Sequence, residues 1–235
     1  MRQRRLNHCW LLWNEQLRPD IQPWHFDSQL LQQQYAAHAT TGGRGGSLFA
    51  TVDEQEWVVR HYRRGGFIGR LVDDRYLFTG LAHSRVYREF QLLEQMRAIG
   101  LPVPQPIAGR FCRHGLLASA DLITLRVAGA WDLVEQLRQQ PLAAGEWQAL
   151  GKLLARFHRH GIFHADLNLR NILIDTQGQF HLIDFDRGQQ RQPAPSWQQA
   201  NLQRLHRSCH KEAAKDPAIH FGEQCWQSLL DGYQG

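Results

Sequence analysis

The sequence predicts an α+β protein of two lobes within a single domain spanning 1–235. The N-terminal lobe, over about 1–122, is small and rich in β-strands, and the C-terminal lobe, over about 123–235, is short and mainly helical. Segments with strand character come mostly first in the chain, and segments with helical periodicity come mostly after them. A length of 235 residues suits two small lobes, and 43% apolar with 21% charged residues is typical of a soluble globular protein.

Local patterns place the elements of the N-terminal half. A helix is predicted near 27–37, with Asp27 as its N-cap. The stretch TTGGRGGSLFATV gives a glycine loop that runs into a strand, and EWVVRHY at 56–62 reads as a second strand. We expect these two strands to form a hairpin around a glycine turn, and GLPVPQPIAG to be a loop.

A further helix is predicted over 84–99, where apolar residues recur at three- and four-residue spacing before Gly100. Glu89 falls on the same apolar stripe, three residues after Val86 and four before Leu93. A carboxylate on a buried face needs a cationic partner, because an unpaired buried charge is costly. The alternative is a glutamate at the edge of the stripe that reaches solvent.

The C-terminal half begins with strand material at 115–127, which we expect to connect the lobes. Helices follow at about 132–139 and at 146–160, the second with Trp147 and Leu150 on one face. The elements after these are a short strand at 171–175, a turn at TQGQ and the strand segment FHLIDFD at 180–186.

Three side chains with oxygen atoms lie in and around this strand–turn–strand pattern. Asp166 and Asn171 are five residues apart, and Asp184 ends the return strand, which would bring it back beside Asn171. Carboxylate and amide oxygens suit Mg²⁺, which takes few protein ligands and completes its shell with water and phosphate. With Asn171 and Asp184 as metal ligands, Asp166 can accept a proton from an attacking hydroxyl.

Charge and cysteine content limit the class of protein. Residues 60 to 88 contain seven arginines and two aspartates. Their local charge of +5 equals the net charge of the whole chain. Such a basic segment favours an anionic partner, with a merely solvated basic face as the alternative. The cysteines are scattered without a CxxC pair, so neither a zinc ribbon nor a disulfide framework is indicated, and a reducing cytosol is expected.

No membrane span or signal peptide is expected, because the apolar stretch after MRQRR is short and interrupted. His158, His160 and His164 lie close to Asp166, but their spacing gives no clean tetrahedral metal set. We expect His164 to orient the loop that follows it.

The loop HADLNLRN resembles the catalytic loop H-R-D-L-x-x-x-N of protein kinases, and DFD at 184–186 resembles their D-F-G. The resemblance implies a protein-kinase-like fold, ATP and Mg²⁺ as cofactors, and Asp166 as the catalytic base. Arg60 in WVVR stands at the position of the lysine in V-A-I-K, and Glu89 resembles the helix glutamate that pairs with that lysine. The segment at the place of the ATP-binding glycine-rich loop consists of Gly42, Gly43, Arg44, Gly45, Gly46 and Ser47.

Two departures place the chain outside ordinary protein kinases. Arg60 replaces a compact ammonium group with a planar fork, and Asp186 replaces the glycine of D-F-G. Only 49 residues follow Asp186, without an A-P-E motif, so a small molecule or a glycolipid is expected as acceptor.

WVVRHYRRGGFIGRL at 57–71 is similar to the lipopolysaccharide kinases, and the similarity extends over essentially the whole chain. It implies transfer of the ATP γ-phosphoryl group to the 4-hydroxyl of the 3-deoxy-D-manno-octulosonate (Kdo) sugar on a lipid A precursor. The implied location is peripheral, at the cytoplasmic face of the inner membrane, where basic residues would meet anionic lipid. Trp10 and Trp13 near the N-terminus would add to this attachment, and the alternative is that they belong to the core. Arg63 and Arg64 are the candidates for the acidic acceptor, and no protein partner is expected.

Three alternatives stay open at this point. An aminoglycoside- or choline-type phosphotransferase shares the short C-terminal lobe, although the arginine cluster disfavours a cationic acceptor. A catalytically silent nucleotide- or membrane-binding pseudokinase would explain Arg60 and Asp186 as decay, but Asp166, Asn171 and Asp184 are all retained. A nucleic-acid-binding module has only the basic composition in its favour, and we expect no nucleic acid partner.

Overall fold

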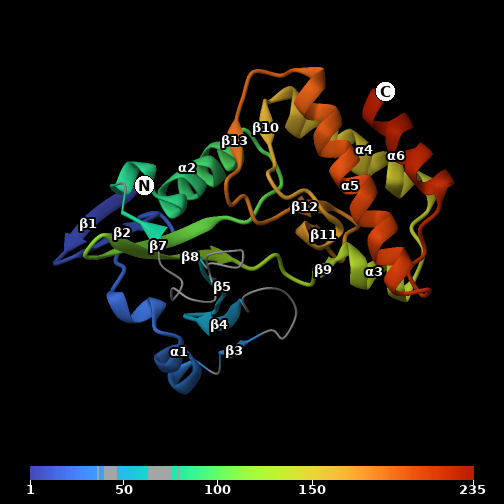
Figure 1. The fold of residues 1–235 in the computed structure, drawn as a ribbon. Helices are drawn as coiled ribbons and strands as arrows, with labels where there is room; N and C mark the ends of the chain where they lie inside the picture. The colour runs from blue at the N-terminus through green and yellow to red at the C-terminus, as the bar shows by residue number, and fades with distance from the viewer. Residues whose placement is uncertain (36, 40–46, 63–75, 79) are drawn as a thin grey trace. The chain divides into compact units, whose positions relative to one another are not determined.

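The computed structural model describes residues 1–35, 37–39, 47–62, 76–78 and 80–235. These residues form an α+β fold, which confirms the predicted fold class (Figure 1). The chain divides into two compact units. The first comprises Met1–Gln95 and Pro104–Arg126, and the second comprises Met96–Val103 and Val127–Gly235.

The first unit is built on an eight-stranded antiparallel sheet. The strands are β1 (Arg2–Leu6), β2 (Cys9–Trp13), β3 (His38–Ala39), β4 (Leu48–Val52), β5 (Gln55–His61), β6 (Tyr76–Leu77), β7 (Pro106–His114) and β8 (Leu117–Leu125). Their order across the sheet is β1-β2-β7-β8-β5-β4-β3, and β6 pairs with β8. The expected β4–β5 hairpin is present, but Asp53 and Glu54 form its turn, with φ of 47° and 66°, where we expected glycine.

Short helical segments join these strands, together with one long helix. They are η1 (Pro23–Phe26), α1 (Ser28–Gln34), η3 (Leu81–His83) and α2 (Arg85–Ala98). The Asp27 carboxylate caps α1 as predicted, because it accepts hydrogen bonds from the backbone N–H groups of Gln29 and Leu30. Gly100, with a φ of 73°, follows the end of α2.

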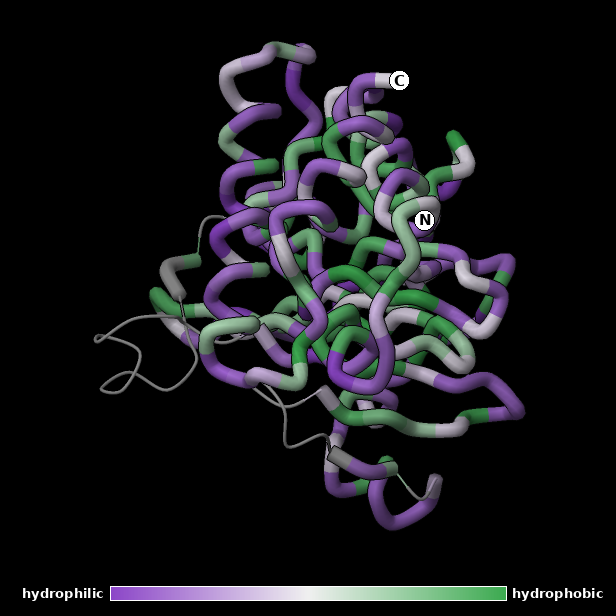
Figure 2. Tube along the Cα trace, turned by 90° about the vertical axis from the view of Figure 1, so that its right-hand side faces the viewer, coloured by the Kyte–Doolittle hydropathy of each residue, from purple (hydrophilic) through white to green (hydrophobic). Residues whose placement is uncertain are grey.

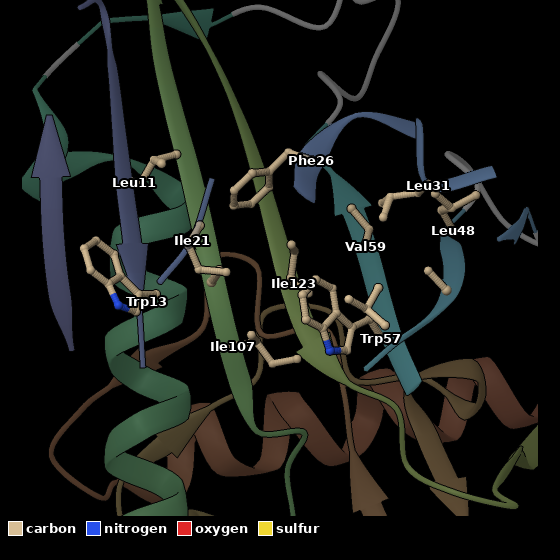
Figure 3. Packing of buried hydrophobic residues seen from close by; sticks show 13 residues of the cluster. Leu11, Trp13, Ile21, Phe26, Leu31, Leu48, Trp57, Val59, Ile107 and Ile123 are labelled. Atoms are coloured by element: carbon tan, nitrogen blue, oxygen red, sulfur yellow. The ribbon is translucent and has the colours of Figure 1, made fainter. Parts of the chain in front are cut away.

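Side chains of β5 alternate between the two faces of the sheet, which positions Arg60. Trp57 and Val59 point into the hydrophobic cluster that also contains Leu31 of α1 and Ile123 of β8 (Figure 3). Because side chains alternate along a strand, Arg60 points to the opposite face, toward α2. On that face a Cβ atom at Gly109 would lie 2.7 Å from Val86 Cγ2, so glycine allows α2 to approach β7 closely.

The N-terminal hairpin of β1 and β2 was not predicted from the sequence. β1, RQRRL, is polar and largely exposed, and it becomes a strand by pairing with β2. The expected loop over 100–109 was also wrong in its last residues, because β7 begins at Pro106. Trp13 is buried, and Trp10 stacks on Phe78 and lies 5.8 Å from the Phe111 ring, so both tryptophans pack within the unit.

Two of the four cysteines are paired, contrary to the expectation from their spacing. Cys9 of β2 and Cys112 of β7 lie directly opposite each other in the sheet and form a disulfide. Cys209 is a free thiol buried in the second unit, and Cys225 is free and half-buried.

The second unit is mainly helical. Its helices are α3 (Leu133–Gln139), α4 (Ala144–Arg159), α5 (Pro195–Lys215) and α6 (Glu223–Gln234), with the short η4 (Leu169–Asn171). Two small sheets accompany them, one of β9 (Trp131–Asp132), β11 (Ile172–Ile174) and β12 (Phe180–Leu182), the other of β10 (Ile162–Phe163) and β13 (Gln189–Gln190). Individual helices carry both hydrophobic and hydrophilic stretches, as expected where one face is buried (Figure 2).

Helices α4 and α6 pack against each other with their backbones in contact. A Cβ atom at Gly151 of α4 would lie 2.0 Å from the Leu229 carbonyl oxygen, and one at Gly232 of α6 would lie 2.0 Å from that of Gln148. Glycine at both positions therefore permits the close approach. Trp147, Leu150, Leu154 and Phe157 of α4 are buried, as the periodicity predicts.

Within the described residues, no helix has both the length and the apolar character needed to cross a membrane.

Candidate active site

In the second unit, the loop after β10 and the strand pair β11–β12 bring Asn171 and Asp184 close together. The strands pair antiparallel, with Ile172 opposite Leu182, and the Ile183 N–H donates to the Asn171 carbonyl oxygen at 3.0 Å. Asp184 follows directly, in the left-handed region with a φ of 61°. The strand–turn–strand geometry expected from the sequence is therefore present.

His164 orients the loop that carries Asp166. Its Nδ1 accepts a hydrogen bond from the Asp166 backbone N–H at 3.1 Å, so its Nε2 carries the proton and donates to the Ile183 carbonyl oxygen at 2.9 Å. The ring is buried and lies 4.7 Å from that of Phe185. A neutral histidine thus ties the Asp166 loop to the segment that ends in Asp184.

Asn171 fits the part of a cation ligand. Its side-chain Nδ2 donates to the Asp166 carbonyl oxygen at 2.9 Å, which fixes the amide and directs its Oδ1 to other partners. The residue is only 9% exposed. Asp184 directly follows Ile183, whose backbone N–H donates to the Asn171 carbonyl oxygen. An amide oxygen and a carboxylate are hard oxygen donors of the kind that Mg²⁺ prefers, so these two residue types fit this ion.

The Asp166 carboxylate is 54% exposed and is held by an arginine that sequence reasoning missed. Arg204 of α5 donates through Nε to Asp166 Oδ1 at 3.1 Å, and its Nη2 donates to the same oxygen. The Arg204 side chain is itself 46% exposed. Both partners are therefore accessible to a bound molecule.

Other polar residues of α5 hold the same loop. Asn201, buried, accepts from the His164 N–H through Oδ1 at 3.2 Å and donates to the His164 carbonyl oxygen through Nδ2 at 2.9 Å. The Ser208 hydroxyl accepts from the Leu169 N–H at 3.2 Å, and Glu212 accepts from Arg170 at 3.1 Å. A hydrogen bond from Lys215, together with the charge of Arg170, lowers the pKa of Glu212.

These α5 residues could have been recognised by their spacing. Positions 201, 204, 208 and 212 recur every three or four residues, so they lie along one side of a helix. A polar stripe of this kind usually marks a solvated face, which is why the pattern alone did not identify them.

In the first unit, Arg60 and Glu89 form the ion pair that the sequence predicts. Arg60 Nη2 lies 2.5 Å from Glu89 Oε1, and the Glu89 side chain is only 2% exposed. Tyr62, another residue that sequence reasoning missed, donates its hydroxyl to Glu89 Oε2 at 2.6 Å. The carboxylate on the apolar stripe of α2 is therefore fully engaged, and the solvent-edge alternative is wrong.

Several predicted site residues lie outside the described residues. These are Gly42, Gly43, Arg44, Gly45 and Gly46 of the glycine-rich segment, and the acceptor candidates Arg63 and Arg64. Ser47 is described and directly precedes β4.

The histidines near the loop take part in other interactions. His158 Nδ1 lies 2.7 Å from the Tyr233 hydroxyl, and both ring nitrogens of His164 are used by backbone groups.

The Kdo/WaaP lipopolysaccharide kinase family model matches residues 28–233 of this chain. The chain belongs to this family. It is 43% identical over 209 residues to the 3-deoxy-D-manno-octulosonic acid kinase of Vibrio vulnificus strain YJ016, which covers 89% of this chain and 88% of the relative. It is 40% identical to the protein of the same name from Mannheimia succiniciproducens, with 97% of each chain covered, and 45% identical over 170 residues to that of Xanthomonas axonopodis pv. citri, covering 72% and 68%.

Family membership confirms the resemblance that the motifs indicate. The matches are kinases in name, and they give no support to an amino-alcohol phosphotransferase, a silent pseudokinase or a nucleic-acid-binding module.

Proposed function

We propose that this family member is an ATP-dependent kinase that phosphorylates the 4-hydroxyl of the Kdo sugar on a Kdo–lipid A precursor, in lipopolysaccharide core biosynthesis. The observation that carries the proposal is the arrangement around Asp166. Its accessible carboxylate lies on a loop that is fixed by His164 and hydrogen-bonded to the Asn171 amide, and Asp184 follows the strand that pairs beside Asn171. This arrangement occurs in a chain whose relatives are named as kinases of 3-deoxy-D-manno-octulosonic acid.

In the proposed reaction Asp166 accepts the proton of the sugar hydroxyl as its oxygen attacks the γ-phosphorus of ATP. A P–O bond forms to the sugar, the bond between the γ-phosphorus and the bridging oxygen breaks, and ADP leaves. Mg²⁺ held by Asn171 and Asp184 would neutralise charge on the phosphates. Such reactions depend mainly on positioning, which is what His164 and Asn201 supply for the Asp166 loop.

The first unit would contribute phosphate binding. Arg60 would contact ATP phosphate, and the buried Glu89 carboxylate with the Tyr62 hydroxyl would hold its guanidinium in place. An arginine can bind two phosphate oxygens at once through its planar fork. The glycine-rich segment 42–47 would add backbone N–H donors.

Arg204 is the described residue that best fits the acidic acceptor. The Arg204 guanidinium donates to Asp166, and this contact must be released, at least in part, before the Asp166 carboxylate can take a proton. Kdo carries a carboxylate of its own, and a half-exposed arginine can exchange one carboxylate partner for another at little cost. Arg204 would then bind the acceptor and leave Asp166 free. Arg63 and Arg64 would serve the remaining anionic groups of the lipid A precursor.

Mass spectrometry of Kdo–lipid A precursor incubated with the protein, ATP and Mg²⁺ tests the proposal. We expect the acceptor to gain one phosphoryl group, and we expect Asp166→Ala to abolish the gain while a fluorescent ATP analogue still binds. Near-normal turnover by Asp166→Ala would exclude Asp166 as the base. Absence of any gain with the wild-type protein, despite ATP binding, would exclude this acceptor.

A further inference from the structure

Two histidines of α5 and one glutamate of α6 lie close together. His206 and His210 are four residues apart on α5, and their Nε2 atoms lie 3.0 Å from each other. Glu223, the first residue of α6, places its Oε2 atom 3.9 Å from the His206 Nε2 and 4.0 Å from the His210 Nε2. Three potential ligand atoms from two helices therefore meet at one point.

The spacing of these three atoms suits a metal ion. A single point about 2.1 Å from all three atoms exists, and this is the ordinary bond length of Zn²⁺ to histidine nitrogen and carboxylate oxygen. Two imidazoles with one carboxylate form a recurrent zinc ligand set that leaves a further position for water. The same nitrogen and oxygen donors also accept Co²⁺ and Ni²⁺.

The two imidazole rings are held in this orientation by aromatic neighbours. His206 stacks on the mostly buried Trp226 at 4.4 Å, and His210 packs edge-on against Phe221 at 5.4 Å. The aromatic neighbours thus orient both imidazole rings without any metal-induced change.

We propose that His206, His210 and Glu223 bind a divalent transition-metal ion, with Zn²⁺ the best fit, and water at the remaining position. The ion would join α5 to the start of α6 and close the segment 216–222 between them. It would stabilise the helix from which Asn201, Arg204 and Ser208 reach the Asp166 loop. It is separate from the proposed Mg²⁺ site in residues and in ligand chemistry, and it does not depend on the proposed function.

Titration of the tag-free, chelator-treated protein with Co²⁺ is the test. We expect one equivalent to give the visible absorption of a nitrogen- and oxygen-ligated ion, to be displaced by Zn²⁺, and to raise the thermal midpoint. His210→Ala and Glu223→Gln should each weaken Co²⁺ binding by at least about 10-fold, because each removes one of three ligands. His160→Ala, at an exposed histidine of the same unit, is the matched control and should bind as wild type does.

His210 and Glu223 have side chains that are 55% and 75% exposed, so their replacement leaves the packing of the unit intact. Circular dichroism of the metal-free variants verifies this point. Failure of the wild-type protein to bind Co²⁺ or Zn²⁺, or equal binding by wild type and both ligand variants, would overturn the inference.

Discussion

At the scale of single residues, Glu89 shows how a charge can be placed on an apolar face. Its carboxylate is buried, and both oxygens are used, one by Arg60 and the other by Tyr62. We predict that Glu89→Ala lowers the free energy of unfolding by about 3 kcal/mol, because it removes a buried carboxylate that pairs with Arg60 and accepts a hydrogen bond from the Tyr62 hydroxyl. Urea denaturation measures this loss.

Glu94→Ala is the control for this variant. Glu94 lies on the same helix and pairs with the N-terminal amine at 3.4 Å, but its side chain is 26% exposed. Removing such a pair should cost less than about 1 kcal/mol. Equal losses for the two variants would show that burial does not increase the contribution of the Glu89 ion pair to the free energy of unfolding.

The proposed exchange of partners at Arg204 predicts a specific kinetic change. Arg204→Gln should raise the KM for the Kdo acceptor by about 10- to 100-fold, the value of one charge-assisted hydrogen bond, and leave the KM for ATP unchanged. With an acceptor whose Kdo carboxylate has been reduced to an alcohol, wild type and variant should have similar KM values.

A loss of kcat in place of a rise in KM would assign Arg204 a role in positioning Asp166. If Arg204 only holds Asp166 in place, the variant should lose kcat equally with both acceptors. That outcome would leave the proposed kinase activity standing and remove Arg204 from acceptor binding.

At the scale of elements, the pair α4 and α6 depends on two glycines. Gly151→Ala would place a methyl group 2.0 Å from the backbone oxygen of Leu229. Because the clash is with the backbone, no side chain can move to relieve it. We predict a loss of about 3 kcal/mol in the free energy of unfolding. Gly145→Ala, in the first turn of the same helix with no atom within 4 Å, should instead stabilise by about 0.5 kcal/mol. Thermal denaturation of both variants tests the close approach of the helices.

The same helix pair contains a pH-sensitive group. Burial lowers the pKa of His158 to about 4, from an ordinary value of 6.5. As the pH falls, His158 is protonated in the unfolded chain before it is protonated in the folded protein. The stability that neutral His158 contributes is therefore fully present above about pH 6.5 and is lost as the pH falls from there toward about 4. Between pH 7.5 and pH 5 the loss should be about 2 kcal/mol.

Urea denaturation at the two pH values measures this loss. His158→Gln should remove about 2 kcal/mol of the pH dependence, and His160→Gln, at an exposed histidine, should retain it. An unchanged pH dependence in His158→Gln would show that another group is responsible.

At the scale of the whole molecule, charge predicts where the protein binds. The chain carries a net charge of +5, and an equal excess is gathered between residues 60 and 88. We predict that it sediments with phosphatidylglycerol vesicles at low salt, stays in solution with phosphatidylcholine, and dissociates as salt screens the attraction. Arg63→Glu with Arg64→Glu should weaken this binding. A protein that stays in solution with anionic vesicles at low salt would contradict the peripheral location.

Helices α1, α2, α3 and α4 were predicted because each carries its own signal, such as the Asp27 cap or the apolar periodicity of 84–99. The strand β1 and the Cys9–Cys112 disulfide were missed because they exist only through partners elsewhere in the chain. Cysteine spacing is uninformative when the two residues are 103 positions apart on paired strands.

The sequence by itself determined the loop motif with Asp166 and Asn171 and the return of Asp184 beside Asn171, and it indicated a cation beside Glu89 with a solvent-exposed glutamate as the alternative. Each depends on a short stretch of chain or on a single physical requirement. Only the tertiary structure decided what holds these groups: Arg204 reaches Asp166 from 38 residues away, and Asn201 reaches His164 from 37. A polar stripe on a helix gives no sign of its partner, because that partner is selected only when the helix packs against the loop.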